Sequence, residues 1–527
     1  MGSITNKIEN FQMIINEDFL EKARTLEPEL HKKTIYPEKM VEIGMGTDDW
    51  EIADEENISR MPQKKLAKGD SVCFDFGDHR VGYVTIKFGS AGSPPDAPAH
   101  IRIRLGEKLC EIAEDASDYE FSISSSWIQE EFFHIDVLPA VLSMPRRYAF
   151  RYMEIKVLDT SPKYQLTVEE IKCETVSSGD RRQVEPLPQS MPNRLKKMDE
   201  VALKTMEDCM QLVFEDGPKR DRRLWIGDLR LQALTNYETF HNTDLVKRCL
   251  YLFAGLTQNE GHVGACLFIE PEFQVDDTSL YDYGLFFISC LYDYYMETRD
   301  METLKELWET AYHQVELAMK RVGEDGVVKD SDDWWCFLDW GDNLNKQAGA
   351  QGVLLYTARQ ALELAEILNE TEKVKKLGEI IRFVRDGAEN KLWIEKQGFF
   401  VSGADGQISW ASQVWLVLAN VFGKAKNREI LSHLLEVQPS VKMATPYMYH
   451  HLVEALLEND MKDEALICME DYWGKMIDDG ADCFYELYDP ENPKASPYGS
   501  RIINSYCHAW SCTTSYFIRK YFTMYFE

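Results

Sequence analysis

The spacing of hydrophobic residues changes along the chain, from every second position to every third or fourth. Between about 69 and 176, apolar and polar side chains largely alternate, and turn-forming stretches such as 89–98 (GSAGSPPDAP) separate the alternating runs. Alternation is typical of antiparallel strands with one wet face, and short runs of it predict a β-sandwich. The predicted strands are 71–77, 81–88, 100–105, 131–137 and 148–157.

After about residue 193 the apolar positions recur at helical spacing, and Gly- and Asp-rich loops lie between the periodic segments. Helix pairs that each carry an apolar face suit a closed double ring of helices, an (α/α)6 barrel. An open solenoid is the alternative, but the sequence has no fixed repeat of roughly 30–45 residues. The predicted helices are 195–213, 231–256, 281–298, 301–322, 348–368, 371–391, 409–422, 428–436, 446–459, 462–477 and 504–526.

These changes of period predict a mainly α protein with an all-β N-terminal module. Residues 1–68 form an N-terminal extension that we expect to be helical or irregular, with one helix at 18–31. Residues 69–190 form the β-sandwich domain and end in a polar linker, 177–192, which holds three prolines. Residues 191–527 form the (α/α)6-barrel catalytic domain. Two domains are expected because single cores rarely exceed roughly 250–300 residues.

Composition and charge exclude several classes of partner. Hydrophobic residues make up 44% and the formal net charge is −31. Such a surface repels phosphate backbones and anionic lipids, so we expect neither nucleic acid nor a membrane as partner. The first twenty residues lack the basic and apolar regions of a secretory signal. Twelve scattered cysteines without a CxxC pair then predict reduced thiols in a cytoplasmic protein.

Charged and aromatic residues gather in the loops between the predicted helices. The loop 214–229 (FEDGPKRDRRLWIGDL) places an aromatic ring among carboxylates and guanidinium groups. This set fits sugar recognition, because a ring stacks on apolar C–H faces while charged groups bind hydroxyls. The alternative is an Asp/Arg network that holds the loop over a helix N-terminus. The candidate residues are Asp216, Arg220, Asp221, Arg222, Arg223, Trp225 and Asp228.

Two further loops add candidates for binding and catalysis. In 331–343 (SDDWWCFLDWGDN), Trp334, Trp335 and Trp340 are candidate walls of a carbohydrate cleft, with packing beneath a loop as the alternative for each ring. In 478–488 (DDGADCFYELY), Glu486 lies among aromatic residues. A carboxyl group that loses solvation in this way has a raised pKa and suits acid–base catalysis, whereas an exposed Glu486 is the alternative.

Other acidic and histidine-containing loops are less specific. His508 lies in 504–511 (NSYCHAWS) and is either structural or a ligand of the same sugar. The loop 276–283 (DDTSLYDY), with Asp282, is a candidate for the same cleft and also suits a helix N-cap. Neighbouring Asp332 and Asp333 offer oxygen ligands for Ca²⁺, but no EF-hand spacing is present. The sequence also lacks a phosphate-binding loop, HExxH and GxSxG, so we expect no cofactor and no metal.

Several of these motifs resemble the α-L-rhamnosidases of glycoside hydrolase family 78. In that family an Asp-x-Pro-x-Arg-Asp-Glu-Arg segment leads into Trp-x-Gly-Asp, and this chain reads DGPKRD at 216–221 and WIGD at 225–228. The segments FDFG at 74–77, FRYMEIKV at 150–157 and DWGD at 339–342 resemble it too, as does a late Tyr-Glu pair followed by a His.

The resemblance covers about residues 70 to 527 and implies β-sandwich modules that lead into an (α/α)6 barrel. It implies that Glu486 is the general base that activates water. The sugar-binding or subsite residues that it implies are Asp216, Arg220, Asp221, Trp225, Asp228 and His508. We add Arg222, Asp282, Trp335, Asp339 and Trp340 as substrate-binding candidates.

One departure concerns the general acid. The family's acid Glu should follow Asp221 directly, but this chain reads RDRR at 220–223, so the Glu is deleted or replaced by Arg222. Three outcomes are open: Asp221 takes the place of the acid, another carboxyl serves, or the protein does not hydrolyse an ordinary rhamnoside. The other carboxyls considered are Asp228, Asp277 and Asp339.

Arginines on both sides of Asp221 bear on this choice. A neighbouring guanidinium lowers the pKa of a carboxyl, so Asp221 can act as an acid only if burial or another carboxylate opposes Arg220 and Arg222. The same two arginines would suit an anionic substrate group, such as a uronate beside the rhamnose.

The leading hypothesis is therefore an inverting glycosidase that removes a terminal α-L-rhamnosyl or related deoxy-sugar residue from a short glycoside. Glu486 would be the base and Asp221 the acid. The alternatives are a lyase acting on a rhamnose–uronic acid linkage and a non-catalytic sugar-binding relative. A small carbohydrate is the expected partner, and the sequence leaves the aglycone, the linkage and a homo-oligomer open.

Overall fold

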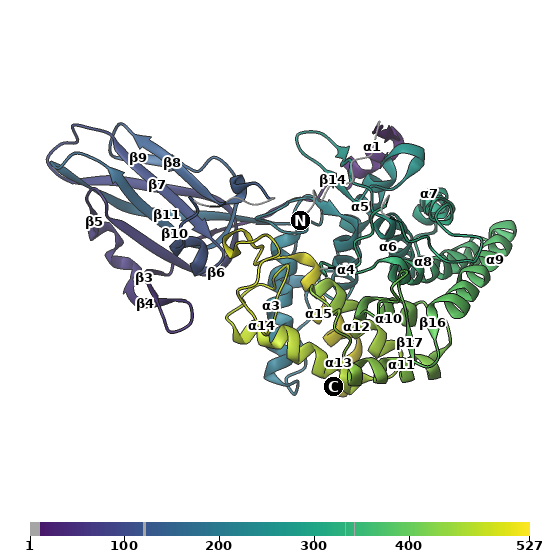
Figure 1. Cartoon of the computed structure of the whole chain (residues 1–527). Helices are drawn as coiled ribbons and strands as arrows, with labels where there is room; N and C mark the ends of the chain where they lie inside the picture. Colours follow the sequence, from purple (N-terminus) through teal and green to yellow (C-terminus); the bar gives the residue numbers. More distant parts are fainter. Residues whose placement is uncertain (1–10, 118, 120–122, 332–333, 342, 527) are drawn as a thin grey trace.

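The computed structural model describes residues 11–117, 119, 123–331, 334–341 and 343–526. An antiparallel β module is followed by a largely helical domain, and the C-terminal segment, yellow in Figure 1, returns to the place where the two parts meet. This order confirms the predicted fold class. Asp332, Asp333 and Asp342 lie outside the described residues.

One long strand organises the β module. The first part of β6 (Ser71–Gly92) pairs with β10 (Tyr148–Asp159) and β3 (Lys39–Met45), and its second part pairs with β11 (Tyr164–Ser177) and β9 (Ala140–Ser143). The two predicted strands 71–77 and 81–88 are therefore one strand, and the sheet that it joins encloses an apolar core. The sheet also contains β2 (His31–Ile35), β4 (Trp50–Asn57), β5 (Lys65–Leu66), β7 (Ala99–Gly106) and β8 (Glu130–Ile135).

The N-terminal part of the chain differs from the prediction. Strands β2, β3, β4 and β5 lie within residues 1–68 and belong to the sheet, so a helical or irregular extension ending at 68 is wrong. Strands β2 and β4 are largely exposed and rich in charged residues. They therefore lack the alternation of apolar and polar residues by which a half-buried strand is recognised. Helix α1 (Glu17–Thr25) ends before Pro28 and packs on the helical domain.

The helical domain is a double ring. Helix α4 (Ile226–Tyr237) has every residue buried, whereas α9 (Thr371–Gly387) is largely exposed, as expected for an inner and an outer helix. The other inner helices are α6 (Tyr281–Thr298), α8 (Gln347–Ile367), α10 (Trp410–Leu418), α12 (Pro446–Glu458) and α15 (Thr514–Phe517). The other outer helices are α3 (Asn193–Cys209), α5 (Thr243–Gly255), α7 (Met301–Met319), α11 (Lys424–Val437) and α13 (Lys462–Met469), which continues through η6 (Glu470–Gly474) into α14 (Lys475–Asp478).

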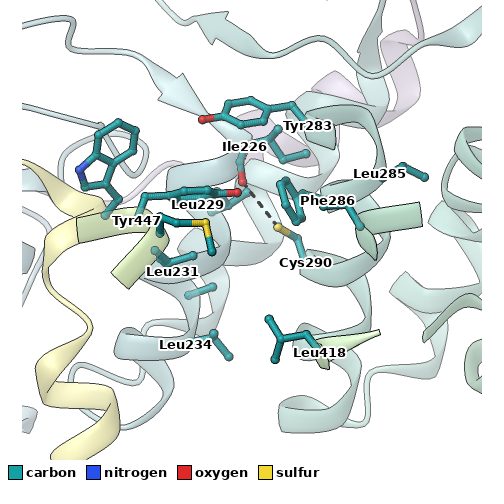
Figure 2. Packing of buried hydrophobic residues seen from close by; sticks show 14 of the residues in the cluster. Ile226, Leu229, Leu231, Leu234, Tyr283, Leu285, Phe286, Cys290, Leu418 and Tyr447 are labelled. Carbon is teal, nitrogen blue, oxygen red and sulfur yellow. Dashed lines mark hydrogen bonds between the residues drawn. The ribbon is translucent and has the colours of Figure 1, made fainter. Parts of the chain in front are cut away.

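Apolar side chains fill the centre of the inner ring. Figure 2 shows Leu229 and Leu234 of α4 on one side of this core, and Phe286 of α6 and Leu418 of α10 on the other. The Cys290 thiol lies 3.9 Å from the Ile226 carbonyl in the same core. All twelve cysteines are free, and eleven of them are buried, as predicted for reduced thiols. Among the described helices, none is both long and apolar enough to cross a membrane.

Two predicted helices are shorter than expected. The segment 231–256 is divided between α4 and α5, because Asn242 accepts a hydrogen bond from Leu245 N and caps the second helix. The segment 504–526 does not begin as a helix: residues 504–508 are non-helical, and η8 (Ala509–Ser511) precedes α15. The non-helical stretch carries part of the candidate site.

Candidate active site

Loops that are far apart in the sequence meet around Glu486. The guanidinium of Arg220 forms an ion pair with Glu486 Oε2, although 266 positions separate the two residues. Tyr498 donates its hydroxyl proton to Glu486 Oε1 over 2.5 Å, and the Trp510 indole donates to the Glu486 carbonyl over 2.9 Å. Glu486 is 5% exposed, so these contacts fix a buried carboxyl group.

His508 lies between two buried carboxyl groups. Its Nε2 is 3.8 Å from Asp216 Oδ2, and its Nδ1 is 3.5 Å from Asp228 Oδ1. Burial, with the nearby charge of Arg220, lowers the pKa of His508 to about 3, so the imidazole is neutral. Burial also raises the pKa of Asp228 well above the ordinary range, with the charge of Asp216 as the next cause. The three side chains therefore form a neutral, hydrogen-bonding surface at neutral pH.

Asp216 and Asp221 form a second close pair of carboxyl groups. Asp216 accepts hydrogen bonds from Asp221 N (3.2 Å) and Arg223 N (3.0 Å). Burial, followed by the charge of Asp221, raises the pKa of Asp216 to about 8. Asp216 therefore holds a proton at neutral pH, while the neighbouring Asp221 side chain is 26% exposed.

Aromatic rings connect the two sides of the site. Trp340 packs edge-on against Phe337 and Tyr498, with ring centroids 5.4 and 6.2 Å apart. Phe337 also stacks on Trp510 at 5.7 Å, and the His508 and Trp510 rings are 4.3 Å apart. The site is thus bounded by ring faces as well as carboxyl groups, which is the combination that sugar recognition requires.

Several buried polar atoms at the site have no hydrogen-bond partner within the described part of the chain. These are Trp225 Nε1, Trp340 Nε1, Asp228 Oδ1 and His508 Nδ1. A buried polar group that lacks a partner costs about 1–3 kcal/mol. Asp228 Oδ1 and His508 Nδ1 face each other at 3.5 Å, whereas the two indole nitrogens are donors that hydroxyl groups of a ligand could satisfy.

Comparison with known proteins identifies the family of the chain. The N-terminal domain of glycosyl hydrolase family 78 α-rhamnosidases matches residues 39–175, and the six-hairpin glycosidase domain of bacterial α-L-rhamnosidases matches residues 189–522. The chain belongs to glycoside hydrolase family 78. It is an α-L-rhamnosidase-type glycosidase, with the β module and six-hairpin domain of that family.

Solved structures of this family share the fold. The rhamnosidase from Klebsiella oxytoca with rhamnose bound is 48% identical, with a TM-score of 0.94 over 97% of this chain and 99% of that chain. The family 78 rhamnosidase of Bacillus sp. GL1 is 20% identical, with a TM-score of 0.72 over 85% of this chain and 46% of that chain. No curated protein sequence matches the chain.

Arg222 of this rhamnosidase does not lie beside Arg220 in a way that would let the two bind one anionic group. Its Nε and terminal nitrogen donate to the carbonyls of Lys219 (3.3 Å) and Arg147 (2.9 Å). Burial and the charge of Arg147 lower the pKa of Arg222 to about 10. Arg220 is engaged by Glu486, so the predicted pair of arginines for an anionic substrate group does not form.

Two of the predicted substrate-binding aspartates hold loops of the rhamnosidase together. Asp282 accepts from the backbone nitrogens of Phe337 and Leu338, each over 3.0 Å. Asp339 accepts from Ala444 N (2.7 Å) and from the Thr445 hydroxyl (2.7 Å), which uses both of its oxygens. These contacts tie the loop that carries Asp339 to the residues just before α12.

Trp335 and Trp225 have different surroundings. Trp335 is half-buried, and its carbonyl accepts from Tyr281 N over 2.9 Å. Trp225 packs edge-on against Tyr283, with centroids 6.2 Å apart, and this tyrosine lies close to Ile226 in Figure 2. Both tryptophans are half-buried, and they differ in their partners: Trp225 packs on Tyr283 of α6, whereas the backbone of Trp335 binds Tyr281 at the start of the same helix.

Two residues at the site of the rhamnosidase were absent from the sequence candidates. Tyr498 contacts both Glu486 and the Arg220 guanidinium, which lies 4.4 Å from the Tyr498 ring centroid. The other is Trp510, two residues after His508, whose indole donates to the Glu486 carbonyl. A single aromatic residue in the polar, Pro- and Ser-rich stretch 489–500 is the signal that would have singled out Tyr498.

Proposed function

We propose that the protein hydrolyses a terminal α-L-rhamnosyl residue of a short glycoside with inversion at the anomeric carbon. Glu486 is the general base and Asp221 the general acid in this proposal. The observation that carries it is the convergence of Glu486 with the Asp216–Asp221 pair around Arg220. Inverting enzymes of this kind place their two carboxyl groups roughly 6.5–9.5 Å apart, which leaves room for a water molecule.

Glu486 is suited to the role of base because its orientation is fixed. Arg220 and Tyr498 each donate to one oxygen of its carboxylate, and its backbone nitrogen donates to the Ser505 carbonyl over 3.0 Å. A general base must lie within hydrogen-bonding reach of the water that it activates, so a fixed orientation favours the reaction.

The surroundings of Asp221 support its role as the acid. The expected opposition is reduced at Arg222, which donates to backbone carbonyls. Arg220 pairs with Glu486 and its other terminal nitrogen lies 3.8 Å from Asp221 Oδ1, so one of the two arginines stays beside the acid. Asp216 supplies the second carboxyl group that the role requires, and it retains a proton at neutral pH. The proton of Asp216 is therefore held next to the partly exposed Asp221, on the side of the site where the leaving oxygen would lie.

The sugar-binding surface supports rhamnose as the substrate. The unpartnered indole nitrogens of Trp225 and Trp340 and the neutral pair of Asp228 and His508 suit the hydroxyls of a pyranose, and the ring faces suit its apolar side. The Klebsiella oxytoca relative is described with rhamnose bound. A lyase has less support, because the arginine pair that would neutralise a uronate does not form.

The test is the substitution Glu486→Gln, assayed with nitrophenyl α-L-rhamnoside. We expect a loss of at least 1,000-fold in kcat, because the glutamine cannot take the proton of the attacking water in the transition state. The matched control is Glu491→Gln, an exposed carboxyl group on the following loop, which should leave activity unchanged. Proton NMR of the first product should show the β anomer. Parental activity in Glu486→Gln, or a first product with the α anomer, would overturn the proposal.

A further inference from the structure

The β module reaches the active site through the buried residue Glu107. Glu107 follows the end of β7 and is 2% exposed. Its Oε2 accepts from Tyr506 N over 2.7 Å and lies 2.9 Å from Lys219 Nζ, while its Oε1 lies 3.1 Å from His79 Nε2. One carboxylate of the β module therefore contacts two loops of the helical domain.

Lys219 uses all three of its donors in this cluster. Besides Glu107, its ammonium group binds Glu111 Oε1 over 2.6 Å and the carbonyl of Asn504. Lys219 directly precedes Arg220, the residue that pairs with Glu486. With all three donors engaged, the ammonium group anchors Lys219. The backbone of the adjacent Arg220 is restrained as a result.

The stretch 504–506 connects the same cluster to Glu486. Lys219 holds the carbonyl of Asn504, and Glu107 holds the amide of Tyr506. Ser505 lies between these two residues, and its carbonyl accepts the backbone proton of Glu486 over 3.0 Å. The backbone on which Glu486 rests is thus held on both sides.

His79 supports Glu107 from within the β module. Its Nδ1 is 2.6 Å from Asp208 Oδ2, and Lys204 donates to Asp208 Oδ1 over 2.6 Å. Burial opposes protonation of His79, but contacts with Cys483, Asp208 and Glu107 raise its pKa well above the ordinary value. Glu107 therefore meets three donors, and a glutamine in its place would present an amide nitrogen to one of them.

We propose that Glu107 is a positioning residue of the rhamnosidase, which sets the relative placement of Arg220, Glu486 and His508 through Lys219 and the stretch 504–506. The β module is then part of the catalytic apparatus and not only a neighbouring domain. This inference rests on the roles proposed for Glu486 and Arg220. It concerns turnover, because misplacement by about 1 Å can cost 100-fold in rate, while the ring faces that hold the sugar stay in place.

The test compares Glu107→Gln with the parent enzyme at 25 °C, well below the unfolding temperature of each. We expect kcat on nitrophenyl α-L-rhamnoside to fall 10- to 100-fold while KM stays within about threefold. The control is Asp199→Asn, which breaks a buried ion pair with Arg519 elsewhere in the helical domain and should lower stability but not kcat. A fall in kcat of less than tenfold, or a loss confined to KM or to thermal stability, overturns the inference.

Two further variants keep the result unambiguous. If Glu107→Gln is recovered unfolded, Glu111→Gln removes another acceptor of Lys219 and is judged by the same criteria. Glu486→Gln separates the two proposals. An inactive Glu486→Gln beside a fully active Glu107→Gln overturns only the positioning role, whereas an active Glu486→Gln overturns the catalytic assignment.

Discussion

Arg220 and Glu486 form an ion pair at the buried centre of the site, with 4% and 7% of their side chains exposed. One of these side chains comes from the loop before α4 and the other from the loop after α14. The pair therefore joins the first and last turns of the helical ring, and it places the proposed base against the loop that carries Asp216 and Asp221. Because both side chains are buried, removing Arg220 leaves the Glu486 carboxylate buried without its counter-ion, with only the Tyr498 hydroxyl as a side-chain donor from the residues that the structure describes.

Replacing Arg220 with Met should damage both activity and stability. Removing one partner of a buried ion pair costs about 3–5 kcal/mol, because the other charge stays buried. We expect kcat to fall at least 100-fold and the unfolding temperature to fall by several degrees. Arg182→Met, which breaks an exposed pair with Asp180, should change neither quantity measurably. An unaltered kcat in Arg220→Met would contradict the role of this pair.

Replacing Asp221 with Asn should affect substrates according to their leaving groups. A general acid matters most where the departing oxygen is strongly basic. We expect a loss of at least 1,000-fold on methyl α-L-rhamnoside and a much smaller loss on a nitrophenyl rhamnoside. Rates on the two substrates give the comparison. Equal losses on both would argue that Asp221 binds the sugar and does not donate the proton.

The pH dependence of turnover should report Asp216. Its pKa of about 8 arises from burial and from the charge of Asp221, so Asp216 loses its proton as the pH rises through that value. We expect kcat to fall above about pH 8 in the parent enzyme. In Asp216→Asn the second carboxyl group is gone, and the alkaline limb should move to lower pH. If kcat of Asp216→Asn falls at the same alkaline pH as kcat of the parent enzyme, the group that titrates is a residue other than Asp216.

Stability should depend on pH through the same residue. The folded-state pKa of Asp216 is raised above the ordinary aspartate value of 3.8, so the folded chain keeps a proton that the unfolded chain loses. Stability therefore falls as the pH rises from about 4 to about 8 and then levels off. Urea unfolding of the parent and of Asp216→Asn across this range should give a flatter profile for the variant.

Tyr498→Phe should separate positioning of the base from binding of the sugar. The substitution removes the hydroxyl that donates to Glu486 Oε1 and keeps the ring beside Arg220 and Trp340. We expect kcat to fall about 10-fold with KM nearly constant. Tyr36→Phe, an exposed tyrosine of the β module, serves as the control. A change in KM alone would assign Tyr498 to sugar binding.

The spacing of apolar residues correctly predicted elements in which those residues form the buried face of the element itself. The segment 281–298 coincides with α6, because its apolar residues recur at helical spacing and nearly all are buried. The segment 504–508 also looked helical, but its backbone groups bind Glu107, Lys219 and Glu486 instead of one another. Such contacts with distant residues cannot be inferred from local spacing.

The candidate site was predictable only as a set of loops. Dense charge beside tryptophan indicated the stretch 216–228, and a carboxyl among aromatic residues indicated Glu486. The direction of each side chain was not predictable. Arg222 has a φ of 62°, and its side chain turns to the carbonyl of Arg147 although it is adjacent in sequence to Asp221. Glu107 escaped detection because two of its three partners, Lys219 and Tyr506, lie more than 100 positions away.

The most direct test of the account is a crystal structure of the protein with rhamnose bound. The account predicts that the anomeric carbon lies between Glu486 and Asp221, with the sugar hydroxyls on Asp228, His508 and the indole nitrogens of the site. Rhamnose bound elsewhere, or a carboxyl group other than that of Asp221 opposite Glu486 across the ring, would contradict it.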